Sequence, residues 1–233
     1  MMNRRQLGQI GALGLGAGSG LLHAATSTLA AAGKAPASQA AASTAGTVAI
    51  TAGKDYLVVK PPAPVEAPAG KIEVVEFFWY KCPHCFHFEP LLEPWVQKLP
   101  QTVAFRRVPV GFNPTFIPLQ KLYYTIEAMG LVGSLHSKIF NAIHLQNVQL
   151  DTDAQIAAWI AKQGVDAKQF AAMYSSFAIA SKATRASKLQ DAYQIDGVPA
   201  MGVAGQFLSN GGLAGNMPRL LQVINTLIAQ QKR

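Results

Sequence analysis

The sequence predicts an α/β domain that carries a cysteine pair and is interrupted by a block of helices. An apolar run at 72–80 leads into the sequence Cys-Pro-His-Cys at 82–85, which contains both cysteines of the 233-residue chain. Another strand candidate follows at 103–110. About 80 residues of helical spacing then separate it from two short strand candidates and a last helix, the order expected of a helical domain inserted into an α/β domain.

The N-terminus has the features of an export signal. Arg4 and Arg5 precede an apolar stretch at 7–22 that is rich in glycine and alanine, and small residues at 24–32 offer cleavage sites. We therefore expect an export signal peptide at 1–30. The alternatives are a segment retained as a membrane anchor, and export by the twin-arginine route rather than the Sec route.

Residues 31–50 predict a flexible linker, because they are mostly Ala, Ser, Thr, Gly and Pro with the single charge Lys34. Removing Arg4, Arg5 and Lys34 from the 20 basic residues leaves 17 against 12 acidic residues, a net charge of +5. These basic residues are scattered and no base-stacking motif accompanies them, so we expect no binding to nucleic acid.

The first part of the α/β domain is expected at 51–112. Its predicted elements are a short strand at 56–60, a central strand at 72–80, a helix at 83–99 and a strand at 103–110. The second of these is apolar on both faces, as a central strand covered by helices should be. Pro90 and Pro94 are expected to bend or divide the helix.

The inserted helical domain is expected at 113–193. Helical spacing occurs at 115–130, 131–145, 152–163 and 166–193. The third helix opens on Thr152 and Gln155, a capping-box pattern. The fourth carries an aromatic and methionine stripe that is most simply core: Phe170, Met173, Tyr174 and Phe177.

The second part of the α/β domain is expected at 194–233. It contains short strand candidates at 200–203 and 206–208 and a last helix at 216–230. That helix places apolar residues on one face, namely Leu220, Val223, Ile224, Leu227 and Ile228.

A lone Cys-x-x-Cys between a strand and a helix is typical of a redox pair. If Cys82 is the N-cap of a helix that begins at Pro83, its sulfur faces unpaired N–H groups and the positive end of the helix dipole. His84 and Lys81 can add positive charge. A stabilised Cys82 thiolate favours the dithiol form, so the disulfide with Cys85 would be strongly oxidising.

Two other interpretations of the cysteines remain open. A structural disulfide is possible, but so short a loop constrains the unfolded chain little. A zinc site would need ligands from His84, His87 or more distant histidines to complete the usual four. We therefore expect no metal.

The sequence resembles the bacterial DsbA family of periplasmic thiol oxidases. The resemblance covers about residue 56 to the C-terminus and rests on two separate motifs. The first motif comprises Glu-Phe-Phe at 76–78, Cys-Pro-His-Cys at 82–85 and Phe-Glu at 88–89. The second motif is Gly-Val-Pro-Ala-Met at 197–201. The resemblance implies a thioredoxin-like fold with an inserted all-helical domain and a periplasmic location. A low cysteine pKa and a strongly oxidising disulfide are established properties of this family.

The resemblance also implies roles for individual residues. Cys82, expected to be exposed and ionised at the helix end, would be the nucleophile. Cys85, one turn farther in and shielded by Phe86 or Phe88, would be the resolving cysteine. Pro199 would be a cis proline beside the pair, and Val198 would offer its backbone to an extended substrate peptide.

Pro83, His84 and Glu76 would tune the active site. Glu76 is the one charge in an apolar strand segment, so burial should raise its pKa unless it finds a partner. The lysine partner expected from the next strand is missing, and we expect Phe105 in its place. Arg106 or Arg107 can substitute for the lysine.

The predicted function is oxidation of unfolded, exported, cysteine-containing proteins, without a cofactor. A DsbB-like membrane oxidase that passes electrons to quinone would restore the disulfide, and we expect a monomer. One rival is a reductase or isomerase on the same fold, which the redox potential would reveal. Another is a binding or chaperone-like module whose peptide binding survives loss of both cysteines.

Overall fold

A computed structural model describes residues 47–231 of the chain. The expected signal peptide at 1–30 and most of the expected linker at 31–50 lie outside the described residues. The linker ends earlier than predicted, because the backbone N–H of Val48 already donates to Thr226 Oγ1 at 3.0 Å and Ile50 packs against the apolar core. No helix among residues 47–231 is long and apolar enough to cross a membrane.

The five strands form one mixed sheet, in the order β1-β5-β4-β2-β3. Their bounds are Leu57–Val58 (β1), Ile72–Phe78 (β2), Val103–Pro109 (β3), Ala200–Val203 (β4) and Phe207–Asn210 (β5). The predicted central position of β2 is confirmed: it pairs in parallel with β3 and antiparallel with β4. Val74, Val75, Phe77 and Phe78 of this strand are fully buried, which explains why the strand is apolar on both faces.

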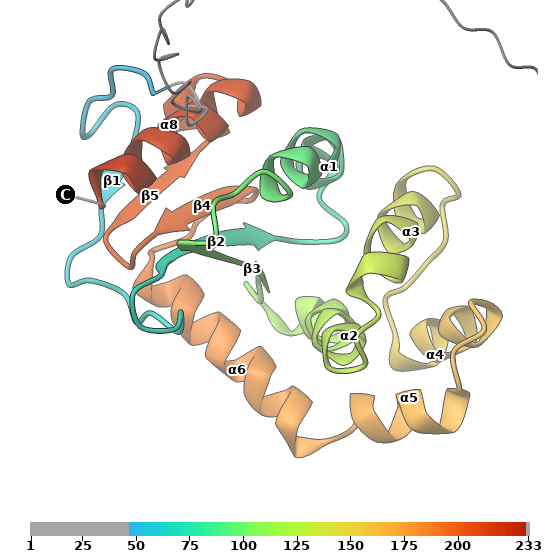
Figure 1. Ribbon diagram of the computed structural model, residues 1–233. Helices are drawn as coiled ribbons and strands as arrows, with labels where there is room; N and C mark the ends of the chain where they lie inside the picture. Colours follow the sequence, from blue (N-terminus) through green and yellow to red (C-terminus); the bar gives the residue numbers. More distant parts are fainter. Residues whose placement is uncertain (1–46, 232–233) are drawn as a thin grey trace, which may run out of the picture. The chain divides into compact units, whose positions relative to one another are not determined.

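Helices cover both faces of the sheet. Helices α1 (Pro83–Val96) and α8 (Met217–Gln230) lie side by side on one face, and α6 (Phe177–Ala192) lies on the other (Figure 1). Pro90 and Pro94 do not divide α1. Both prolines are exposed, and the opposite side of the helix is held by buried residues such as Phe88 and Leu92.

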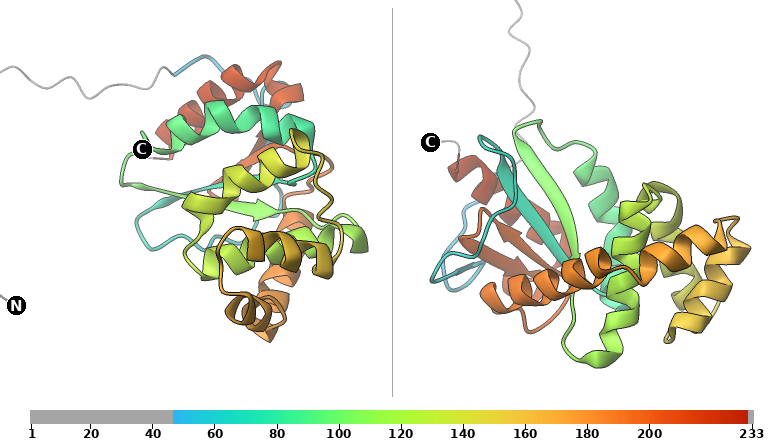
Figure 2. Two further views of the ribbon diagram at one scale, coloured as in Figure 1. Left: turned by 90° about the vertical axis from the view of Figure 1, so that its right-hand side faces the viewer. Right: turned by 90° about the horizontal axis from the view of Figure 1, so that it is seen from below.

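A block of helices between β3 and β4 in the chain is gathered around α2 (Figure 2). They are a 3₁₀ turn at Pro114–Phe116, then α2 (Ile117–Ala128), α3 (Val132–His144), α4 (Asp153–Lys162) and α5 (Ala167–Tyr174). The capping box of Thr152 and Gln155 is present at the start of α4, as predicted.

The single helix predicted at 166–193 is wrong, because the chain breaks into α5 and α6. Ser176 caps the second helix by accepting the Ile179 N–H at 3.3 Å. The break changes the phase of the aromatic stripe: Phe170 and Tyr174 are buried, whereas Phe177 is 87% exposed. Phe177 is therefore not a core residue.

The C-terminal segment returns to the sheet. Strand β4 has the predicted bounds, and the predicted apolar face of α8 is buried against the sheet. A short helix that was not predicted, α7 (Gly211–Ala214), lies between β5 and α8 and is capped by Asn210, which accepts the Leu213 N–H at 2.9 Å. The α/β class with helices between β3 and β4 is confirmed.

Candidate active site

Cys82 stands at the start of α1, as its position before a proline predicts. It is the N-cap residue in an extended conformation (φ −81°, ψ 116°), and Pro83 occupies the first turn. The Cys82 carbonyl accepts the Phe86 N–H at 3.1 Å, and the Cys82 N–H donates to the Trp79 carbonyl at 3.0 Å. The sulfur therefore lies where the first N–H groups of the helix have no partner within the helix.

Cys82 is less accessible than predicted. Only 8% of the residue is exposed, and Cys85 is fully buried. Both are free thiols, and the Cys82 thiol donates to the Val198 carbonyl at 3.3 Å. The prediction of an exposed Cys82 is wrong, because the loop before β4 contacts this residue. Cys82 is still the more accessible cysteine of the pair.

The surroundings of Cys82 favour its thiolate. The hydrogen bond from the Cys85 thiol contributes most, and with the N–H groups of Cys85 and His84 and the nearby charge of His84 it lowers the pKa of Cys82 to about 6, although burial opposes this shift. The contributions of the helix N–H groups and of His84 have the direction expected of them, and their roles in the chemistry stay predictions. The larger contribution of the Cys85 thiol was not predicted.

Cys85 has the opposite tendency. Burial raises the pKa of its thiol far above the ordinary value, and the neighbouring Cys82 and Glu76 act in the same direction. Cys85 belongs to a buried apolar cluster against which Phe86 packs, whereas Phe88 belongs to a separate cluster. Of the two shields proposed for Cys85, Phe86 is therefore the one in its cluster.

The other polar residues near the pair have simpler positions. His84 and His87 are exposed, and Lys81 forms an ion pair with Asp151, 2.5 Å between Nζ and Oδ1. The positive charge of Lys81 therefore pairs with the Asp151 carboxylate rather than with the Cys82 sulfur. In the described part of the chain, no three His, Cys, Asp or Glu side chains gather as ligands for a metal ion.

The loop before β4 brings Val198 and Pro199 to the cysteine pair. The Val198–Pro199 peptide bond is cis, as the resemblance implied. Both residues line an open hollow of about 570 Å³, together with His84, Asn210 and Met217 among others. A hollow bordered by His84 on one side and this loop on the other can receive an extended peptide next to Cys82.

Glu76 on β2 is fully buried, and its charge acts on the Cys85 thiol. Its partner is Arg107, opposite it on β3, with 3.0 Å between Arg107 Nε and Glu76 Oε2. Phe105 pairs with Val74 instead. The arginine therefore replaces the lysine expected from the family pattern, two residues farther along the strand than Phe105.

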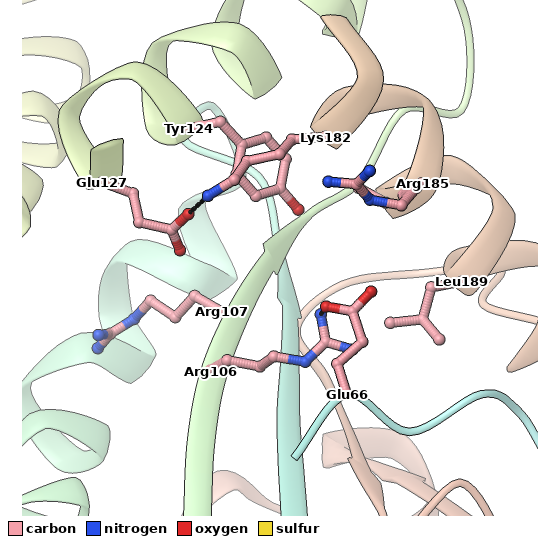
Figure 3. Close-up of a pocket in the computed structure, with 9 residues that line it drawn as sticks. Glu66, Arg106, Arg107, Tyr124, Glu127, Lys182, Arg185 and Leu189 are labelled. Atoms are coloured by element: carbon pink, nitrogen blue, oxygen red, sulfur yellow. Dashed lines mark hydrogen bonds and ion pairs between the residues drawn. The ribbon is translucent and has the colours of Figure 1, made fainter. Parts of the chain in front are cut away.

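Arg106 does not take part, because neighbouring residues of a strand point to opposite faces of the sheet. Figure 3 shows the two guanidinium groups leaving β3 in opposite directions. Arg106 is bound to Glu73, with 3.0 Å between Nε and Oε1. It lines a hollow of about 230 Å³ together with Arg107, Tyr124 and Lys182.

Burial raises the pKa of Glu76 to about 8, and the charge of Glu89 acts in the same direction, despite the opposing effect of Arg107. Glu76 Oε1 has no hydrogen-bond partner among residues 47–231. The ion pair with Arg107 therefore does not keep the pKa of Glu76 at its ordinary value. At neutral pH, Glu76 can hold a proton close to Cys85.

Further residues extend this ion pair into a polar cluster that the sequence did not predict. Oε2 of Glu89, on α1, lies 3.2 Å from Arg107 Nη2. Its other oxygen lies 3.3 Å from His136 Nε2, and His136 Nδ1 lies 2.8 Å from the Tyr80 hydroxyl. Glu89 was recognised only as part of a motif, and nothing in the spacing of His136 distinguished it from other helical residues.

Comparison with known proteins places the chain in a family. A family model described as a DSBA-like thioredoxin domain matches residues 73–220. The thiol:disulfide interchange protein DsbA of Burkholderia cepacia is 44% identical over 186 residues, which are 80% of this chain and 88% of the relative. The chain belongs to the DsbA family.

Solved structures agree with this assignment. The crystal structure of Pseudomonas aeruginosa DsbA is 42% identical, with a TM-score of 0.75, and covers 78% of this chain and 95% of that protein. DsbA of Xylella fastidiosa is 28% identical, with a TM-score of 0.71, over 76% and 95% of the two chains. The predicted thioredoxin-like fold is confirmed, and this member of the DsbA family is a protein thiol:disulfide oxidoreductase.

Proposed function

We propose that the chain acts as a dithiol oxidase, donating a Cys82–Cys85 disulfide to newly exported proteins in the periplasm. The observation that carries this proposal is the position of Cys82 at the N-cap of α1 beside a buried Cys85, surroundings that lower the pKa of Cys82 to about 6. A stable thiolate stabilises the reduced protein, so the disulfide readily accepts electrons from substrate thiols. A reductase would instead need a disulfide that is more stable than those of its substrates.

The reaction follows from the positions of the two sulfurs. A substrate thiolate attacks Cys82 Sγ, the Cys82–Cys85 bond breaks, and Cys85 leaves with the electron pair. The second substrate thiolate then attacks the substrate sulfur of the mixed disulfide and releases Cys82. The substrate loses two electrons and forms its disulfide, and this protein gains them as a dithiol. Cys82 leaves as a thiolate, while the high pKa of Cys85 requires that it take up a proton.

Five neighbouring residues support these steps in the proposal. Pro83 and His84 form the helix start that stabilises the Cys82 thiolate, and Glu76 supplies the proton that Cys85 takes up. Val198 and Pro199 form the platform for the substrate backbone. The Val198 carbonyl, which accepts from Cys82 in the free protein, would then turn to the incoming peptide.

The location and partners belong to the proposal too. An export signal at 1–30 would carry the protein to the periplasm, where its substrates are unfolded proteins with free cysteines. A DsbB-like membrane oxidase linked to quinone would remove the two electrons from the reduced pair. No cofactor bound to this chain is needed, because thiol–disulfide exchange transfers the electrons directly between sulfurs.

Two variants test the assignment of the sulfurs. Cys85→Ala removes the thiol that can reverse a mixed disulfide, so Cys82 should accumulate covalent adducts with exported proteins, seen as slow bands on a non-reducing gel. Cys82→Ser should abolish both the adducts and the oxidation of a reduced test protein. Adducts on Cys82→Ser but not on Cys85→Ala would contradict the proposal. A Cys82–Cys85 disulfide that glutathione cannot reduce would instead favour the rival function of a reductase.

A further inference from the structure

His136, on α3, connects the helical block to the buried carboxyls of Glu76 and Glu89 and their shared partner Arg107. Only 4% of the residue is exposed, and both ring nitrogens have a partner. Nδ1 lies 2.8 Å from the Tyr80 hydroxyl oxygen, and Nε2 lies 3.3 Å from Oε1 of Glu89. The faces and edges of the ring contact the aromatic side chains of Phe78, Tyr123 and Phe140.

These partners determine how the ring is protonated. A carboxylate only accepts hydrogen bonds, so Nε2 carries a hydrogen and donates it to Glu89. Burial lowers the pKa of His136 below its ordinary value, so the ring is neutral at pH 7. Nδ1 is then the acceptor for the Tyr80 hydroxyl. His136 therefore acts on Glu89 as a fixed hydrogen-bond donor rather than as a charge.

Glu76 and Glu89 share one buried cation. Arg107 contacts Glu76 through Nε at 3.0 Å and Glu89 through Nη2 at 3.2 Å. Glu89 has a second donor in His136, whereas Glu76 Oε1 has no partner in the part of the chain that the structure describes. Two buried carboxylates beside one guanidinium disfavour double ionisation, so the number of donors decides which carboxyl keeps its charge.

We propose that His136 is a positioning residue for the thiol chemistry: by holding Glu89 as the carboxylate, it makes Glu76 the group that exchanges a proton with Cys85. This inference rests on the proposed function. It makes the helical block part of the redox machinery, because the deciding donor comes from α3. The transfer is balanced: Glu76 gives its proton to the Cys85 thiolate as the disulfide opens and takes it back when the disulfide is restored.

The surroundings of the two carboxyls agree with this assignment. Burial alone would raise the pKa of Glu89, but the hydrogen bond from His136 and the charge of Arg107 lower it below its ordinary value. Strand β4, which pairs with β2 at Met201, brings no titratable group. The groups that face the two carboxyls and His136 are Arg107 from β3, Cys85 and Glu93 from α1, Tyr80 after β2 and Tyr123 from α2.

Two substitutions at one position separate donation to Glu89 from packing. The amide nitrogen of His136→Gln can occupy the place of Nε2 and keep the donor to Glu89. The shorter His136→Asn can face only Tyr80 and leaves Glu89 without this donor. Thermal unfolding of both variants checks that they fold. The chain has only six glutamates, so carbon-13 labelling of their carboxyl groups gives few signals, which Glu76→Gln and Glu89→Gln assign.

In the reduced wild-type protein, the Glu76 signal should titrate near pH 8 and the Glu89 signal should remain that of a carboxylate down to pH 4.5. His136→Asn should lower the Glu76 midpoint by about one pH unit, and the rate of oxidation of a reduced dithiol peptide at pH 8 should fall about fivefold with the protonated fraction of Glu76. His136→Gln should restore both.

Three results would overturn the proposal: a wild-type protein in which Glu89 carries the proton, an Asn variant that titrates like wild type, or Asn and Gln variants that change alike. The first needs no variant, so the proposal is testable even if His136→Asn does not fold. The titration is independent of oxidase activity. A wild-type protein that titrates as expected but does not oxidise the peptide would contradict the proposed function and not the role of His136.

Discussion

Replacing Glu76 by glutamine should stabilise the protein, although it removes one side of a buried ion pair. Burial raises the pKa of Glu76 from 4.5 to about 8. The folded state then binds more protons than the unfolded state between these values, so stability falls as the pH rises through this window. The penalty is absent below pH 4.5 and grows by about 1.4 kcal/mol for each pH unit between the two pKa values. It reaches about 3 kcal/mol at pH 7 and levels off near 5 kcal/mol above pH 8.

Glu76→Gln removes this penalty, since glutamine has the shape of the protonated carboxyl and can still accept from Arg107. Urea unfolding of the reduced protein at pH 4.5, 7 and 8.5 measures the effect. The variant should match wild type at the lowest pH and exceed it by about 3 kcal/mol at pH 7. Glu93→Gln is the control: this carboxyl also pairs with Arg107 but is 50% exposed, so the change should stay within about 1 kcal/mol. Destabilisation by Glu76→Gln at pH 7, or a difference independent of pH, would refute the prediction.

Three further predictions concern the cysteines and one helix. His84→Ser should raise the pKa of Cys82 by less than about one pH unit in a thiolate titration, because the N–H groups of the helix remain, and should make the disulfide less oxidising by under about 30 mV against glutathione. Cys85→Ala should raise the pKa of Cys82 more than His84→Ser does, since it removes the larger contribution; an equal or smaller rise would contradict the ranking. Ser176→Ala should cost about 1 kcal/mol in urea unfolding by removing the cap of α6, and an unchanged midpoint would show that the cap contributes nothing.

The residues that act through the local chain could be predicted from the sequence. A cysteine before a proline at the end of an apolar strand predicts its place at a helix start, and the structure has Cys82 there. The cis bond before Pro199 followed from the family motif. Both depend on neighbours in sequence, so spacing and motif sufficed.

Residues that act across elements could not be predicted with the same certainty. The partner of Glu76 depends on the register of β2 against β3, which places Arg107 rather than Phe105 or Arg106 opposite it. The place of His136 depends on how α3 packs against the segment after β2, and no local pattern records that packing. The break at Ser176 was hidden because helical spacing continues on both sides of it, and Phe177 was misplaced as a result.

The oxidase chemistry is tested most directly by titrating the Cys82 thiolate in the reduced protein. Ultraviolet absorbance of the thiolate is followed against pH, with Cys82→Ser to identify the signal. We predict a midpoint at about pH 6, where the Cys85 thiol, the helix N–H groups and His84 together hold the charge. A midpoint near 9.0, the value of an unperturbed thiol, would contradict this explanation of the site.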